Sequence, residues 1–178
     1  ELGRLKEAQP LLQLSDPSPF SVTWQPGDQL GTLYRVEITN IGGVAATGVQ
    51  VQVTQARPSI RDGLRTWLHQ TDDNENGFLR TFDLPIGEET GKTIDTFYSI
   101  DAEGWQLRLY HAVSGCDRRL PRQHYVVRIT ASAINAPQPA SRWYEVDFDQ
   151  GADLRMRGIP EPMAVSEQGS EAEQQIEA

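Results

Sequence analysis

Residues 33–54, LYRVEITNIGGVAATGVQVQVT, decide the fold class of this chain. Apolar and polar side chains alternate on both sides of a glycine-bearing turn. The apolar positions are Tyr34, Val36 and Ile38 before the turn and Val49, Val51 and Val53 after it. Successive side chains of a β-strand point to opposite faces, so each run has one apolar and one polar face. The stretch therefore predicts two antiparallel strands, paired through the turn, with one side packed on a core.

Further short runs follow the same pattern, and proline and glycine turns separate them. They occupy residues 11–16, 20–25, 78–84, 93–100, 105–111, 124–133 and 142–148. Residues 57–71 either form a short helix capped by Ser59 or hold a strand that starts near Leu64. Short strands with turn signals between them predict an all-β antiparallel sandwich of about seven to eight strands.

The domain boundaries follow from changes in composition. Residues 1–9 are good helix formers that stop at Pro10, and they predict a short helix or linker from an upstream anchor. Residues 10–157 form the predicted sandwich. Residues 158–178 lack aromatic side chains and are rich in Glu, Gln, Ser and Pro, which predicts a disordered acidic tail. Because the chain begins with Glu1 rather than Met, we expect a longer protein whose upstream segment holds a membrane anchor.

The net charge of the chain argues against some kinds of binding partner. The 178 residues carry a formal net charge of −9. The segment after Arg157 contains acidic residues but no lysine or arginine. This balance argues against a broad nucleic-acid footprint or binding to an anionic membrane surface. The basic cluster of Arg118, Arg119 and Arg122 is interpreted as a solvated loop. With Cys116 as the only cysteine, no intrachain disulfide forms, so packing must hold the fold together.

Residues 34–49, YRVEITNIGGVAATGV, resemble the V-x-N-x-G-x-x-x-A-x-x-V pattern of bacterial immunoglobulin-like domains of the cell-adhesion-related (CARDB-like) type. Residues 84–88, LPIGE, resemble the L-x-P-G-E turn of those domains, with Pro and Gly displaced. The first residues, ELGRLKEAQPLLQL, are similar to the stretch after the transmembrane helix of bacterial membrane-anchored sandwich proteins. The resemblance implies a non-catalytic interaction or assembly module, the soluble portion of a membrane-associated or cell-envelope protein, with a protein partner or self-assembly.

Residues 72–83 fit the spacing of a calcium loop. Side-chain oxygens of Asp72, Asn74 and Asn76, the carbonyl of Phe78 and the carboxylate of Asp83 would surround one Ca²⁺ ion. The other interpretation is a β-hairpin with its tip at Asn76 and Gly77, which are typical of a type I′ turn. Calcium is the one cofactor that the sequence suggests, and it would make the chain a calcium-stabilised adhesion or carbohydrate-binding module.

Signals for catalysis are weak. His111, Cys116 and His124 match no closed zinc site, and Cys116 beside Arg118 lacks a base that the sequence identifies. Residues 87–93, GEETGKT, have the wrong spacing for a phosphate-binding loop and are interpreted as a connection between strands. An enzyme of unknown class is the second alternative to an interaction module.

Two tryptophans are candidate partner-binding residues. Tyr144, Val146 and Phe148 share one parity, so Trp143 points to the opposite face, beside Glu145 and Asp147. An outward tryptophan anchors a protein partner or stacks on a sugar ring. Alternatively, a loop or the segment around Trp67 covers Trp143. The predicted binding surface combines Trp143 with the insertion at residues 57–77, since binding loops gather at the ends of a sandwich.

Overall fold

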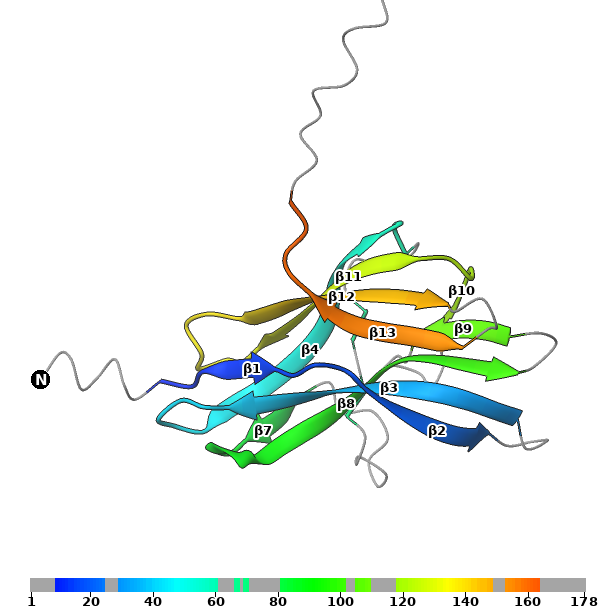
Figure 1. Ribbon diagram of the computed structural model, residues 1–178. Coiled ribbons are helices and arrows are strands. Elements are labelled where there is room, and N and C mark those ends of the chain that lie inside the picture. Colours follow the sequence, from blue (N-terminus) through cyan, green and yellow to red (C-terminus); the bar gives the residue numbers. More distant parts are fainter. Residues whose placement is uncertain are drawn as a thin grey trace, which may run out of the picture.

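The computed structural model (Figure 1) describes residues 9–24, 29–60, 66–67, 69–70, 81–101, 105–109, 118–148 and 153–163. These residues form strands and connections, and no helix occurs in the described ranges. The strands are β1 (Leu12–Leu14), β2 (Ser18–Trp24), β3 (Gln29–Asn40), β4 (Ala46–Arg57), β5 (Thr66–Trp67), β6 (His69–Gln70), β7 (Phe82–Leu84), β8 (Gly87–Asp101), β9 (Trp105–Leu109), β10 (Arg118–Leu120), β11 (Tyr125–Ser132), β12 (Ala140–Phe148) and β13 (Leu154–Ile159).

The strands build two sheets in which every pair is antiparallel. One sheet has the order β1-β3-β8-β9-β10, with β2 also on β3 and β6 also on β8. The other has the order β13-β12-β11-β4-β5, with β7 also on β4. Figure 1 shows β11, β12 and β13 in one layer and β2, β3 and β8 in the other. The all-β prediction is confirmed, and two facing antiparallel sheets are consistent with a β-sandwich.

The expected pairing of the two strands in residues 33–54 is wrong. β3 pairs with β1, β2 and β8 in the first sheet, whereas β4 pairs with β5, β7 and β11 in the second. The connection at residues 41–45 therefore crosses from one layer to the other. Alternation does not distinguish these two arrangements, because a hairpin and a crossover both turn their apolar faces toward the same core.

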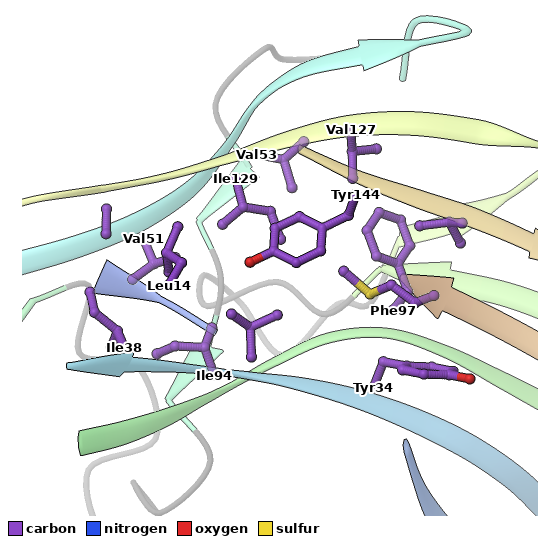
Figure 2. Close-up of a cluster of buried hydrophobic side chains, with 14 of the residues drawn as sticks. Leu14, Tyr34, Ile38, Val51, Val53, Ile94, Phe97, Val127, Ile129 and Tyr144 are labelled. Carbon is purple, nitrogen blue, oxygen red and sulfur yellow. The ribbon is translucent and has the colours of Figure 1, made fainter. Parts of the chain in front are cut away.

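The core lies between the layers, and the predicted apolar faces supply it. Val49, Val51 and Val53 are 0%, 2% and 4% exposed. In Figure 2, Ile38 and Ile94 from one layer point toward Val51, Ile129 and Tyr144 from the other. Each fully buried aliphatic side chain of this kind stabilises the fold by roughly 1.5–3 kcal/mol. The predicted faces of the last two strands are also confirmed, since the core includes Tyr125, Val127, Ile129, Ala131, Tyr144 and Val146.

Several boundaries differ from those that the sequence predicts. β8 begins at Gly87, so the segment that resembles a phosphate-binding loop belongs to a strand. Residues 118–120, expected in a loop, form β10. β13 was not predicted, and it includes Gly158 and Ile159, which the sequence assigned to the tail. The two short strands β5 and β6 favour the strand alternative for residues 66–67 and 69–70.

The two predicted terminal elements lie largely outside the described residues. The helix expected at residues 1–9 falls there except for Gln9, and so does the tail from residue 164 onward. No helix in the described part of the chain is long and apolar enough to cross a membrane.

Candidate functional site

A recess of about 420 Å³ lies beside β12 and β13. Two strands of the second sheet and β3 of the first contribute its walls. The lining residues are Tyr34, Glu145, Asp147, Arg155, Met156 and Arg157. Four of these six carry a charge, two of each sign, so the recess combines opposite charges with an aromatic and a thioether side chain.

The alternation of β12 and β13 places the charges on the outer face of the sheet. Tyr144 and Val146 point into the core, and so do Leu154 and Met156. The intervening side chains therefore point outward. The strand register sets Glu145 opposite Arg157 and Asp147 opposite Arg155. Opposite charges that face each other across an antiparallel pair are mutually stabilising, so the register fixes two complementary pairs along the recess.

Glu145 is the centre of a three-residue ionic cluster. Its Oε2 accepts a hydrogen bond from Nε of Arg157, and its Oε1 lies 2.7 Å from Nε2 of His124. The hydrogen bond from Arg157, followed by that from His124, lowers the pKa of the Glu145 carboxyl below its ordinary value of 4.5. The bond to Glu145 also raises the pKa of Arg157. Glu145 is therefore ionised across the neutral range.

The inner wall of the recess is fixed to both sheets. The hydroxyl of Tyr34 donates to the backbone carbonyl of Leu154 over 3.1 Å, which joins β3 to β13. The hydroxyl of Thr96 in β8 donates to the backbone carbonyl of Tyr34 over 2.7 Å, and its oxygen lies 3.5 Å from Sδ of Met156. Tyr34 and Met156 are 8% and 5% exposed. Tyr34 and Met156 thus form a largely buried inner wall of the recess that is bonded to both sheets.

The calcium prediction falls mainly outside the described residues, which exclude Asp72, Asn74, Asn76 and Phe78. Asp83 is exposed at the middle of β7, and its Oδ1 accepts a hydrogen bond from the backbone N–H of Gly48 over 3.0 Å. Gly48 has a φ of 59°, in the left-handed region that favours glycine. Asp83 therefore stabilises an irregular segment of β4. In the part of the chain that the structure describes, no cluster of three or more His, Cys, Asp or Glu residues is placed to hold a metal ion.

Trp143 points to the outer face of its sheet, as the sequence predicts, but it is only 8% exposed. It lies opposite Arg128 and Ile159 on the neighbouring strands and is not part of the central core. The structure therefore favours the alternative in which other residues cover this ring. Trp67 lies in β5, opposite Gln52, and its side chain is outside the described set.

Of the histidines and the cysteine that the sequence offered as candidates, the structure describes only His124. His124 lies directly before β11, where its side chain is half-exposed, whereas His111 and Cys116 are outside the described residues. Sequence reasoning missed Arg155 and Arg157 because it ended its last strand at Phe148. The signal was present in residues 154–159, LRMRGI, where apolar residues and arginines alternate.

The described residues therefore form a two-sheet antiparallel β domain with a charged recess beside β12 and β13. Comparison with protein-family models, curated proteins and solved structures finds no match to this chain.

Proposed function

We propose that this chain is a non-catalytic interaction module that receives a protein partner at the β12–β13 recess. The observation that carries the proposal is the placement of two opposite-charge pairs across the strand register, Glu145 with Arg157 and Asp147 with Arg155. They line a recess that Tyr34 and Met156 also line. Arginine, tyrosine and methionine are enriched where proteins bind one another.

The state of Glu145 supports binding rather than proton transfer. A carboxyl that acts as a general acid near neutral pH needs a raised pKa, and the pKa of Glu145 is lowered. Its two oxygens already interact with His124 and Arg157. Such a carboxylate holds its neighbours in place, so Glu145 positions Arg157 at the rim of the recess.

The balance of charge supports a partner with both signs of charge. The recess offers two carboxylates and two guanidinium groups, so a purely anionic or purely cationic ligand meets repulsion as well as attraction. A protein surface supplies acidic and basic side chains at fixed spacing, and it also covers Tyr34 and Met156. Together with the sequence resemblance, this supports an immunoglobulin-like module in the soluble portion of a bacterial membrane-anchored or cell-envelope protein.

Site-specific photo-crosslinking in cells that express the gene tests this proposal. A photoreactive amino acid replaces the exposed Asp147 in one variant and the exposed Ser132, at the far end of β11, in the matched control. We expect a discrete crosslinked protein from position 147 alone, and we expect Arg155→Gln with Arg157→Gln to remove it. No product from position 147, or equal products from both positions, overturns the proposal.

A further inference from the structure

β2 lies at the edge of the first sheet. Among the described strands it pairs with β3 alone, over Ser18 to Trp24. From Ser18 to Thr23 its side chains are exposed or half-buried. An edge strand presents unpaired backbone groups that accept another strand, and natural edges are usually blocked by charges, bulges or proline. β2 contains no charged residue, and Pro19 is its one blocking residue.

The backbone groups that face the free edge follow from contacts on β3. The N–H of Ser15 donates to the carbonyl of Glu37, so the backbone groups of Glu37 point toward the β1–β2 side. The carbonyl of Tyr34 accepts from Thr96 of β8, so Tyr34 points to the opposite side. Because these directions alternate along an antiparallel strand, Leu33 and Arg35 bond to β2.

Phe20 and Ser18 lie opposite Leu33 and Arg35, so they use their backbone groups within the sheet. The alternate residues of β2, namely Pro19, Ser21 and Thr23, therefore direct their backbone groups to the free edge. Pro19 fits this position because proline has no N–H to donate. The free edge offers the carbonyls of all three residues and the N–H groups of Ser21 and Thr23.

We propose that a second copy of this chain docks on this edge, with β2 antiparallel to β2 and Ser21 on the two-fold axis. In this register the Ser21 residues exchange both backbone hydrogen bonds, and the N–H of each Thr23 donates to the carbonyl of Pro19 in the other copy. No like charges face each other, because the strand has none. Since both copies use the same edge, the pairing closes on itself and yields a dimer.

The side chains of β2 are complementary in the same register. Phe20 shares the outer face of the sheet with Leu33 and Tyr98, which lie side by side in the strand pairing and are both 2% exposed. The guanidinium of Arg35 lies 4.5 Å from the Phe20 ring centre, yet Phe20 remains 41% exposed. The dimer sets Val22 of the second copy opposite Phe20, an aromatic–β-branched pair that extends this apolar row.

Sedimentation of the full chain over a range of concentrations tests the dimer. Ser21→Pro removes the N–H at the axis, which the monomer does not use, so the thermal unfolding of the monomer should be retained. We expect this variant to raise the dimer dissociation constant roughly tenfold or more. The matched control Ser21→Ala keeps the N–H and should dimerise like the wild type. Higher salt should strengthen the dimer, because it screens repulsion between two copies of net charge −9.

Oxidative crosslinking tests the register. With Cys116→Ser as background, Ser21→Cys should form an intermolecular disulfide, since Cα atoms of such a pair are about 5.5 Å apart. Thr23→Cys should not, since its Cα atoms are about 14 Å apart. Monomers at every concentration up to about 1 mM, a dimer that Ser21→Pro leaves unchanged, or equal crosslinking at both positions overturns the inference. Arg155→Gln with Arg157→Gln should leave the dimer intact, so this test is independent of the recess.

Discussion

The buried side chain of Asn40 donates to the backbone carbonyl of Val44 over 2.7 Å and so holds the crossover between the two sheets. Its Oδ1 also accepts hydrogen bonds from the backbone N–H groups of Leu11 and Gly42. One amide thus replaces the backbone partners that the chain loses where it leaves β3. An asparagine suits this position because it both donates and accepts.

Replacement of Asn40 should therefore destabilise the fold strongly. Asn40→Ala leaves several backbone groups of the crossover without partners, and we expect a loss of about 3 kcal/mol in the free energy of unfolding, measured by urea denaturation. Asn135 is the matched control, because its amide bonds to Thr47 and Ala45 in the same way at an exposed site. Asn135→Ala should lose about 1 kcal/mol or less. Equal losses in the two variants contradict the role assigned to Asn40.

The crossover also marks the limit of what the sequence predicts about the fold. Alternation identified the apolar faces of β3, β4, β11 and β12, because burial of one face imposes a period of two on the sequence. It did not identify the sheet to which each strand belongs. That choice depends on contacts far apart in the chain, such as the amide of Asn40 against the carbonyl of Leu84.

Gly42 and Gly91 should respond differently to alanine. A Cβ at Gly42 meets backbone atoms of Gln9, Pro10 and Leu11, which the neighbouring strand holds in place. The atoms nearest to a Cβ at Gly91 belong to the side chain of Glu37, which is exposed and can shift to make room. We expect Gly42→Ala to lower the free energy of unfolding by about 2–3 kcal/mol and Gly91→Ala by less than about 1 kcal/mol. A Gly91→Ala loss as large as that of Gly42→Ala argues against this packing.

The ionic cluster at Glu145 should make stability depend on acid pH. The folded-state pKa of Glu145 is lowered, so its contribution is fully present above the unfolded value of 4.5. It is lost as the pH falls through the folded-state pKa. We expect Glu145→Gln to be less stable than the wild type at pH 7, and the difference to shrink steadily below about pH 4.5. Paired urea titrations between pH 7 and pH 3 measure this difference, and a constant gap contradicts the assignment.

The sequence predicted less of the candidate site than of the fold. Sequence reasoning placed Glu145 and Asp147 on the outer face, but their partners Arg155 and Arg157 come from a strand that it did not predict. The strand register sets Glu145 opposite Arg157 and Asp147 opposite Arg155, and so brings the four charges together at the recess. Register depends on how β13 aligns with β12 and on the packing of Leu154 and Met156 in the core, and local periodicity does not specify either.

Trp143 should behave as a structural residue rather than as an exposed anchor. Its 8% exposure means that most of the indole is packed, so Trp143→Ala should reduce the free energy of unfolding by about 3 kcal/mol or more. Leu11 is the matched control, because it is 56% exposed and its truncation should change stability by less than about 0.5 kcal/mol. Urea denaturation of both variants decides between the two interpretations. If Trp143→Ala is as stable as Leu11→Ala, the ring is accessible in solution and becomes a partner-binding candidate again.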